Sequence, residues 1–215
     1  MVGSRWCPDC RQKVQGVPAP YCSACGLPLL RPGLCPNCIQ SRPRYQALRS
    51  WLVFEGPIRR ALHTLKYRRN VALGEALATD MRDFICRLDW PVDAVVPVPL
   101  GRQRQKERGY NQVGLVAGPL AAQLGWSYQA KSLVRRRETR SQVGLSAQAR
   151  RENVADAFQA DQKSISGRSI LLMDDVATTG ATLAAGAEAL LDAGAKSVYA
   201  LTIARALPHH GLQIA

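Results

Sequence analysis

The sequence predicts an α/β fold, in which a mainly parallel sheet is flanked by helices and preceded by a small cysteine-rich module. Apolar runs of strand length alternate with helical patterns from residue 51 onward. Six of the seven cysteines fall within the first 38 residues, as three Cys-x-x-Cys pairs. A chain of 215 residues has room for one core of about 150 residues and a small appendage. We therefore expect the module at residues 1–42, a linker around residues 41–45 and a main domain at residues 46–215.

The cysteine pairs predict a zinc-binding module. They are Cys7/Cys10, Cys22/Cys25 and Cys35/Cys38. Two residues between cysteines let both thiolates point at one ion, and two such pairs complete a tetrahedral site. Six thiols cannot fill two such sites, so either one pair is spare or a second site takes other ligands. Cys22/Cys25 is the pair we expect most, and the sequence leaves open which other pair joins it. A redox role is disfavoured, and a module of about 40 residues needs a metal in place of a core.

The first half of the main domain alternates between strand and helix patterns. A short apolar run at residues 51–54 predicts a strand. Pro57 then begins a helix, whose apolar face is formed by Ile58, Ala61, Leu62 and Leu65. Residues 72–88 give a second helical pattern, and we expect its Cys86 in the core. Residues 93–100 predict a strand that runs into a proline-rich and then basic turn, because proline cannot continue the pairing.

The second half continues the alternation. Residues 108–124 predict a helix that is bent near residues 118–119, where glycine precedes proline. A short strand at residues 133–134 precedes a run of arginines. Strand, helix and strand then follow at residues 170–173, 181–193 and 198–203. Ligands of such sheets bind at the carboxyl ends of the strands, where the basic turn and the segment after residue 173 both fall.

Two adjacent carboxylates, Asp174 and Asp175, end the apolar run at residues 170–173. A turn and a helix start follow, with the residues Thr178, Thr179, Gly180, Ala181 and Thr182. Backbone N–H groups at a helix start have no intrahelical partner and attract a phosphate, which glycine lets approach closely. The acids would repel a phosphate, so ribose hydroxyls or a hydrated Mg²⁺ suit them. An acidic strand end without a ligand is the poorer explanation, because unpaired carboxylates there are costly.

The charge of the chain indicates a polyanionic partner. The formal net charge is +13, and more than half of the 29 basic residues lie in blocks at residues 59–69, 102–108 and 131–151. Such blocks favour phosphorylated small molecules, nucleic acid or both, while a solvated surface without a partner is the alternative. Aromatic residues make up only 6%, so no stacking platform for single strands is evident.

The apolar residues are arranged as in a packed globular protein. They make up 47% of the chain, yet no run approaches the roughly 18 apolar residues of a membrane span. The first six residues contain no apolar segment of a secretory signal. We therefore expect a cytoplasmic protein without a membrane span.

The acidic segment resembles the motif with which type I phosphoribosyltransferases bind phosphoribosyl pyrophosphate (PRPP). In that family the acids hold the ribose 2′- and 3′-hydroxyls and the next loop holds the 5′-phosphate. The resemblance implies that Asp174 and Asp175 bind the ribose and that residues 178–182 bind the phosphate.

Further segments resemble the ComF/GntX-type proteins. The string Arg108-Gly109-Tyr110-Asn111-Gln112 is similar to their RGFNQ signature, and residues 65–67, 97–100, 137–145 and 151–158 fit as well. With the cysteine pairs in front, the resemblance covers nearly the whole chain. This family is linked to natural transformation, the uptake and handling of single-stranded DNA, and has a phosphoribosyltransferase-like fold. The resemblance implies PRPP or a ribose 5-phosphate ligand, with single-stranded DNA and competence-machinery proteins as further partners.

The resemblance also implies roles for the basic segments. Pro99, Leu100 and Arg102 would belong to the turn that binds pyrophosphate, and Arg135 and Arg137 to a flexible loop over the reacting centre. Mg²⁺ bound with PRPP and these basic groups would stabilise the departing pyrophosphate, mostly by positioning and electrostatics. The catalytic candidates are therefore Asp174, Asp175, Arg135 and Arg137. Either basic segment can instead be a charged surface loop.

The chain departs from the family patterns at two places. Purine-type phosphoribosyltransferases have an aspartate that contacts the base where this chain has Thr178, so no carboxylate base is offered there. Many relatives carry four cysteine pairs, and this chain has three. The sequence leaves three functions open: a PRPP-binding protein of competence, a nucleic-acid-binding adaptor with a vestigial or regulatory pocket, and a phosphoribosyltransferase of nucleobase metabolism.

Overall fold

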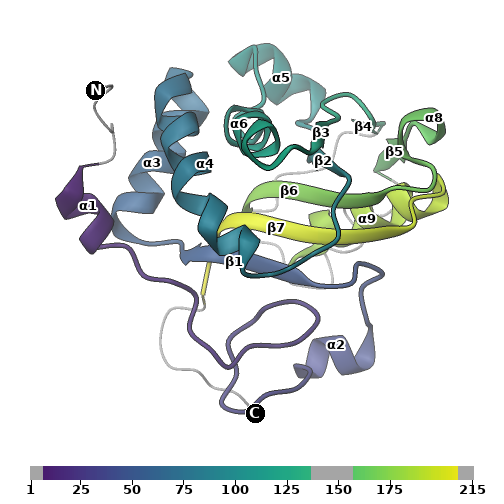
Figure 1. Cartoon of the computed structure of the whole chain (residues 1–215), viewed down its shortest axis with the longest axis horizontal. Coiled ribbons are helices and arrows are strands. Elements are labelled where there is room, and N and C mark those ends of the chain that lie inside the picture. Colours follow the sequence, from purple (N-terminus) through teal and green to yellow (C-terminus); the bar gives the residue numbers. More distant parts are fainter. Residues whose placement is uncertain (1–6, 137–156, 208–215) are drawn as a thin grey trace.

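A five-stranded parallel sheet forms the centre of the molecule (Figure 1). The computed structural model describes residues 7–136 and 157–207. The strands follow the order β1-β7-β6-β2-β3, and each neighbouring pair is parallel. Their bounds are Leu48–Val53 for β1, Ala94–Pro97 for β2, Ser127–Tyr128 for β3, Ser169–Ala177 for β6 and Ser197–Arg205 for β7. The predicted α/β fold with a mainly parallel sheet is confirmed.

Helices cover both faces of this sheet (Figure 1). On one face lie α3 (Gly56–Arg68), α4 (Val71–Cys86) and α6 (Gly114–Leu124). On the other lie α9 (Ala181–Asp192), α8 (Gln162–Ile165) and the antiparallel pair of β4 (Leu133–Arg135) and β5 (Phe158–Ala160). A strand buried on both sides explains the continuous apolar run at residues 170–173.

Helix α3 forms where the sequence predicts it. Pro57 stands in its first turn, and its buried residues include the expected Ile58, Ala61, Leu62 and Leu65. The helix ends at Arg69, which adopts the left-handed conformation with φ of 42°. Lys66, in the last turn of this helix, lies at the edge of the sheet where β2 and β6 end.

The helix predicted at residues 108–124 is confirmed over residues 114–124, but its start is not. The structure has two helices there, α5 (Arg102–Arg108) and α6, and Gly109 ends the first with φ of 72°. Pro119 lies inside α6, and the bend expected near residues 118–119 stays a prediction. Proline cannot donate a hydrogen bond to the carbonyl of Leu115, four residues earlier. Helix α4 comes close at that point: a Cβ added to Gly74 would lie 2.4 Å from this oxygen.

Cys86 is exposed, so its predicted place in the core is wrong. It is the last residue of α4, whose buried face is formed by Leu73, Gly74, Leu77, Ala78, Met81 and Ile85. Ile85 therefore takes the core position at this end of the helix, and Cys86 follows it on the solvent side.

The cysteine-rich module packs along the outer edge of β1. It contains the short helices α1 (Pro8–Gln12) and α2 (Pro36–Gln40) and a small buried cluster around Cys22. The N–H of Leu48 donates to the carbonyl of Ala24 over 2.7 Å, and Gly16 forms an antiparallel bridge with Leu52. The module is thus joined to the sheet by backbone hydrogen bonds. The boundary we expect at residues 42–46 stays a prediction.

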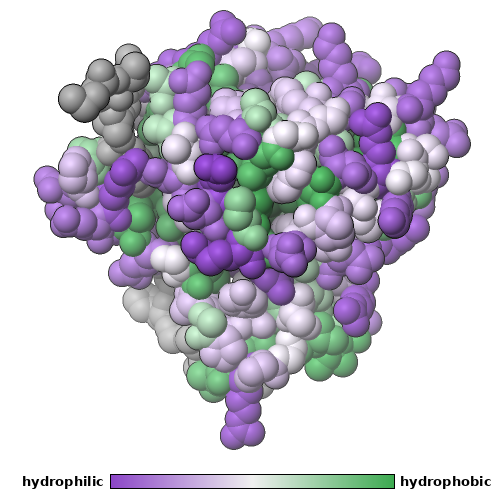
Figure 2. All heavy atoms as spheres, in the orientation of Figure 1, coloured by the Kyte–Doolittle hydropathy of each residue, from purple (hydrophilic) through white to green (hydrophobic). Residues whose placement is uncertain are grey.

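Hydrophilic side chains cover much of the face seen in Figure 2, and hydrophobic ones appear there in small separate groups. Among the described residues, no helix combines the length and apolarity that crossing a membrane requires.

Candidate functional site

The carboxyl ends of β2 and β6 form the edge at which the candidate site lies. Val98 donates its N–H to the carbonyl of Met173 over 2.8 Å, which holds the turn after β2 beside β6. Asp174 and Asp175 belong to β6 itself, which continues through Ala177 and does not end at residue 173 as the sequence suggests. The structure therefore brings the turn after β2 and the acid pair to one edge, as parallel strands require.

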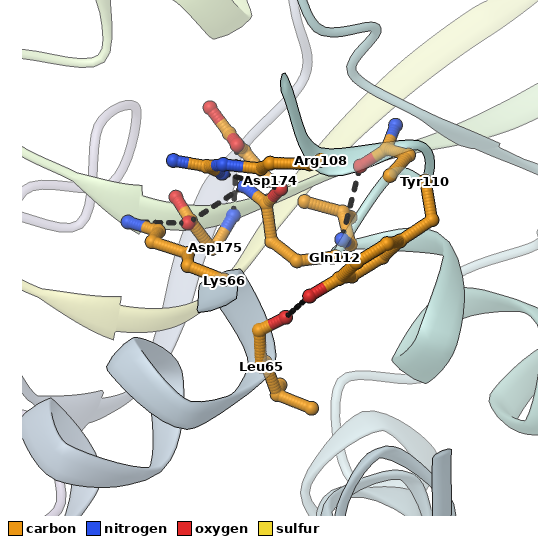
Figure 3. Close-up of polar contacts among 9 residues, drawn as sticks. Leu65, Lys66, Arg108, Tyr110, Gln112, Asp174 and Asp175 are labelled. Atoms are coloured by element: carbon orange, nitrogen blue, oxygen red, sulfur yellow. Dashed lines mark hydrogen bonds and ion pairs between the residues drawn. The ribbon is translucent and has the colours of Figure 1, made fainter. Parts of the chain in front are cut away.

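Asp175 is held by side chains from two other elements (Figure 3). Its Oδ2 atom lies 2.7 Å from the ammonium of Lys66 at the end of α3. The same oxygen accepts a hydrogen bond of 3.1 Å from the amide of Gln112. Arg108 in turn donates to the amide oxygen of Gln112 over 2.8 Å, which fixes the orientation of the amide. Since Asp175 and Gln112 are 8% and 4% exposed, these contacts are sheltered from water.

Asp174 lies in a different environment from its neighbour. Burial raises the pKa of Asp174 to about 7, and the charge of Asp175 adds to this rise. The charges of Lys66 and Arg135 act in the opposite direction. At neutral pH the pair therefore carries between one and two negative charges, and the ammonium of Lys66 offsets one of them.

The loop after the acid pair leads into a glycine-capped helix start, and phosphate binding there stays a prediction. Gly180 adopts φ of 80° and caps α9, whose first helical hydrogen bond runs from the N–H of Ala184 to the carbonyl of Gly180. Thr179 accepts from the N–H of Ala181 over 3.4 Å. Thr178 is exposed, and Thr179 and Thr182 are half-buried. The start of a twelve-residue helix thus lies directly beyond the two carboxylates.

The proline-rich turn is shorter than predicted. Pro99 and Leu100 are half-buried beyond β2, and α5 begins at Arg102, where the sequence suggests a continuing basic turn. Arg102 is exposed at the start of this helix. The role of these three residues in binding pyrophosphate stays a prediction.

Arg135 acts on the acid pair through its charge. It is the last residue of β4, its guanidinium lies 5.3 Å from the ring centroid of Phe158, and its charge lowers the pKa of Asp174. Arg137 and the remainder of the predicted loop, up to residue 142, lie outside the described residues. The catalytic role of both arginines stays a prediction.

Four cysteines of the module lie together: Cys22, Cys25, Cys35 and Cys38 are buried, with sulfur atoms within 4.8 Å of one another. The sulfurs of Cys25 and Cys35 are 3.7 Å apart. Zinc–sulfur bonds of ~2.3 Å give tetrahedral S···S edges of about 3.8 Å, so these residues fit a zinc ion. Although burial acts to raise the pKa of Cys22, hydrogen bonds from the N–H groups of Cys25 and Cys35 lower it to about 7.

The structure thus resolves which pair accompanies Cys22/Cys25. Cys7 caps the start of α1 and Cys10 lies within it, and neither belongs to the cluster of four cysteines. Helix α1 is joined to α4 by the ion pair of Arg11 with Asp80 at 2.6 Å. Cys7 is exposed and Cys10 is half-buried. Metal binding by Cys7 and Cys10 stays a prediction.

Two comparisons with known proteins identify the family of this chain. A family model described as phosphoribosyl transferase domain matches residues 115–210, which include the acid pair and the following loop. The DNA utilization protein YhgH of Salmonella typhimurium is 35% identical over 193 residues, 86% of this chain and 84% of that protein. Competence protein F of Haemophilus influenzae is 30% identical over 209 residues, 93% of this chain and 90% of that protein. This chain belongs to the ComF family.

A further ComF-family relative is competence protein ComFC of Bacillus subtilis, which is 29% identical over 209 residues, 93% of this chain and 83% of that protein. Among solved structures, the glutamine PRPP amidotransferase of B. subtilis shares 18% identity at a TM-score of 0.45, over 66% of this chain and 30% of that one. So low a likeness carries no argument about activity.

The structure explains the ComF signature at residues 108–112, to which the sequence alone assigns no roles. Tyr110 donates to the carbonyl of Leu65 over 2.6 Å, and its oxygen accepts from the N–H of Arg69 over 2.8 Å (Figure 3). Asn111 donates to the carbonyl of Val98 over 2.9 Å. The signature thus ties the end of α3, the turn after β2 and Asp175 together. One feature of the sequence indicates these contacts. The polar Gln112 stands before an apolar helix, and an amide buried there needs hydrogen-bond partners.

Proposed function

We propose that this ComF-family chain binds PRPP or a ribose 5-phosphate unit at the edge where β2 and β6 end. The observation that carries the proposal is the acid pair beside a phosphate-type helix start, within the segment that the phosphoribosyl transferase domain model matches. Ribose hydroxyls would donate to Asp174 and Asp175, while the 5′-phosphate would meet the N–H and hydroxyl groups of residues 179–182.

The cations around the site favour a ligand with several phosphates. Lys66 forms an ion pair with Asp175, and the charge of Arg135 lowers the pKa of Asp174. The oxygen atoms of the acid pair also suit a hydrated Mg²⁺, and such an ion bound with PRPP would offset the charge of the pyrophosphate. We propose that Pro99, Leu100 and Arg102 meet the pyrophosphate, because Pro99 and Leu100 lie in the turn held beside β6 and Arg102 begins the helix that follows it.

Transfer of the ribosyl group to a base is a separate question from binding. Thr178 is exposed where purine-type enzymes have an aspartate, and an unactivated hydroxyl is no general base at neutral pH. The proposal is therefore ligand binding, and any turnover needs an acceptor that requires no carboxylate at residue 178.

We also propose that zinc binds Cys22, Cys25, Cys35 and Cys38 as a structural ion, because four buried cysteines leave no open coordination position for a substrate. Such free thiols favour a reducing compartment, so we propose that the protein works in the cytoplasm.

Calorimetry tests the ligand. Wild type, Asp175→Asn and the exposed control Asp192→Asn are titrated with ribose 5-phosphate and with PRPP plus Mg²⁺. We expect wild type and the control to bind both, and Asp175→Asn to lose at least about tenfold in affinity, or ~1.4 kcal/mol. Equal binding by all three proteins, or none by wild type, would contradict the proposal.

A second function is supported by the charge of α5. Its residues 102–107 are exposed, and Arg102, Arg104 and Lys106 are among them, beside the turn after β2. Because relatives are named a DNA utilization protein and competence proteins, we propose that this surface binds single-stranded DNA.

Salt titration of DNA binding tests this second function. The double variant Arg104→Glu, Lys106→Glu should weaken binding of an oligothymidylate and make the slope of log K against log salt shallower by roughly 0.7 per lost phosphate contact. The matched control is Arg82→Glu on α4. An unchanged slope in the α5 variant would count against DNA binding at this surface.

A further inference from the structure

Arg205, the last residue of β7, is the bulkiest fully buried side chain of the described part of the chain, at 2% exposure. Its Nη1 atom donates to the carbonyl of Cys25 over 2.7 Å, while its Nε atom is buried without a hydrogen-bond partner. Four ion pairs join residues within 7–136 and 157–207, and none of them includes Arg205. A carboxylate therefore does not balance this charge in the described structure.

A buried guanidinium needs an anion, because an uncompensated charge in a protein interior costs several kcal/mol. The guanidinium of Arg205 donates to the backbone of Cys25. Its charge also acts against the rise that burial causes in the pKa of Tyr45. Both residues belong to the junction between the cysteine module and the sheet. A cluster of four neutral thiols, or of two disulfides, would leave the guanidinium unbalanced.

A metal-loaded cluster supplies the missing charge. Four thiolates exceed the charge of Zn²⁺ by two negative charges, and they lie next to the residue whose carbonyl Arg205 binds. We propose that Arg205 is the internal counter-charge of a zinc tetrathiolate at Cys22, Cys25, Cys35 and Cys38. This inference rests on the proposed zinc site and is independent of PRPP binding.

The same junction supports the phosphate loop. A Cβ added to Gly180 would lie 3.3 Å from Cδ2 of Leu48 and 3.4 Å from the hydroxyl of Tyr45, so both side chains touch the loop. Leu48 is bonded to the module through Ala24, and the charge of Arg205 acts on Tyr45. Arg205, at the end of β7, therefore contacts the module at Cys25 and acts on Tyr45, which touches the loop of the proposed ligand site.

Zinc affinity, measured on the full-length zinc-loaded protein by chelator competition, tests the proposal. Arg205→Lys keeps the charge, and Arg205→Gln keeps a hydrogen-bond donor without the charge. The control is Arg49→Gln, because Arg49 also donates to a module carbonyl, that of Ser23, at 3.1 Å. We expect Arg205→Lys and the control to stay within about threefold of wild type, and Arg205→Gln to bind zinc at least about tenfold more weakly, or ~1.4 kcal/mol.

Cobalt substitution checks that the ligands are unchanged. The thiolate-to-cobalt charge-transfer band should keep its wild-type intensity in Arg205→Gln, so that the loss reflects charge and not a missing cysteine. Wild-type zinc affinity in Arg205→Gln, or equal losses in the lysine and glutamine variants, would overturn the proposal. Absence of zinc binding in wild type would refute the zinc site itself.

A double variant tests the proposal if Arg205→Gln alone does not fold. Adding Cys38→His replaces one thiolate by a neutral ligand and so halves the excess negative charge of the centre. The double variant should then fold and bind zinc, with less dependence on residue 205. If Cys38→His alone folds but its combination with Arg205→Gln does not, the counter-charge explanation is wrong.

Discussion

Asp174 and Asp175 are adjacent in the chain but have different partners in the folded protein. Asp175 has Lys66 and Gln112 on one oxygen, whereas burial and the neighbouring charge raise the pKa of Asp174 to about 7. The folded protein therefore binds a proton on Asp174 that an unfolded chain releases near pH 4. Protonated Asp174 therefore favours the folded state at acid pH. This contribution to the free energy of unfolding is lost as the pH rises from about 4 to about 7.

Asp174→Asn should remove this pH dependence. We expect the variant to gain stability over wild type between pH 5 and pH 8, by on the order of 1–3 kcal/mol. The lower part of that range is expected because Asp174 keeps some solvent contact. Urea unfolding at both pH values measures the gain, and Asp192→Asn, on an exposed carboxylate, serves as the control. A stability difference that is the same at both pH values would contradict the raised pKa.

Lys66→Met should expose the charge of the acid pair. We expect a loss of about 1–3 kcal/mol in the free energy of unfolding, since Asp175 keeps only the amide of Gln112. Millimolar Mn²⁺ should recover part of this loss by taking the place of the ammonium, and should leave wild type unchanged. Thermal unfolding with and without Mn²⁺ measures both effects, with the exposed Lys196→Met as control. An unchanged variant would show that the ion pair contributes nothing.

The sequence predicts the acid pair, but it does not predict the distant residues that contact the pair. The acid pair is predictable because strand end, carboxylates and helix start are consecutive. Lys66, Gln112 and Arg205 act on partners far away in the chain, and no local pattern assigns them. A basic residue at the end of a strand gives no sign that it will be buried at 2% exposure against a carbonyl 180 residues away.

At the scale of elements, the segment from β6 through the loop to α9 is the best predicted part of the chain. Its signals are local: an apolar run, a glycine that must adopt positive φ, and a helical pattern. The break between α5 and α6 is missed because Gly109 stops a helix less visibly than proline does, while Pro119 is tolerated inside one. Strand β3 has only two residues, too few for a pattern.

Gly180→Ala should separate backbone strain from function in the loop. Gly180 and Gly167 have similar φ values of 80° and 74°, but only Gly180 has side chains within 4 Å of an added Cβ. Both substitutions should cost about 1–2 kcal/mol of stability, because alanine is strained at positive φ. Only Gly180→Ala should also weaken ribose 5-phosphate binding, which calorimetry measures. Equal affinity in the two variants would remove this loop from the ligand site.

At the scale of the whole molecule, the module and the sheet are joined by hydrogen bonds, and we expect them to unfold together. Module carbonyls accept hydrogen bonds from the N–H groups of Leu48 and Val53, and the buried Arg205 donates to the carbonyl of Cys25. The small cluster around Cys22 is continuous with this contact and has little apolar area of its own. We therefore expect the stability of the main domain to depend on the state of the cysteines.

Removal of zinc should lower the unfolding temperature of the entire chain. We expect one calorimetric transition that shifts down by roughly 5–10 °C on chelation, because a loss of a few kcal/mol in a chain of this size has that effect. Cys86→Ser should respond like wild type, since Cys86 is exposed and apart from the cluster. A separate early transition, with the main one unmoved, would show that the module unfolds by itself.

The position of the module at β1 has a consequence for solubility. β1 is the outermost strand of the sheet, and Ala24 and Gln15 occupy hydrogen-bonding groups of Leu48 and Val53 that would otherwise face outward. An uncovered parallel edge is a template on which another chain can add a strand. The cysteine module thus shields the sheet from aggregation. Because we expect the module and the sheet to unfold in one transition, loss of the metal would expose this edge together with the rest of the chain, and self-association would accompany unfolding.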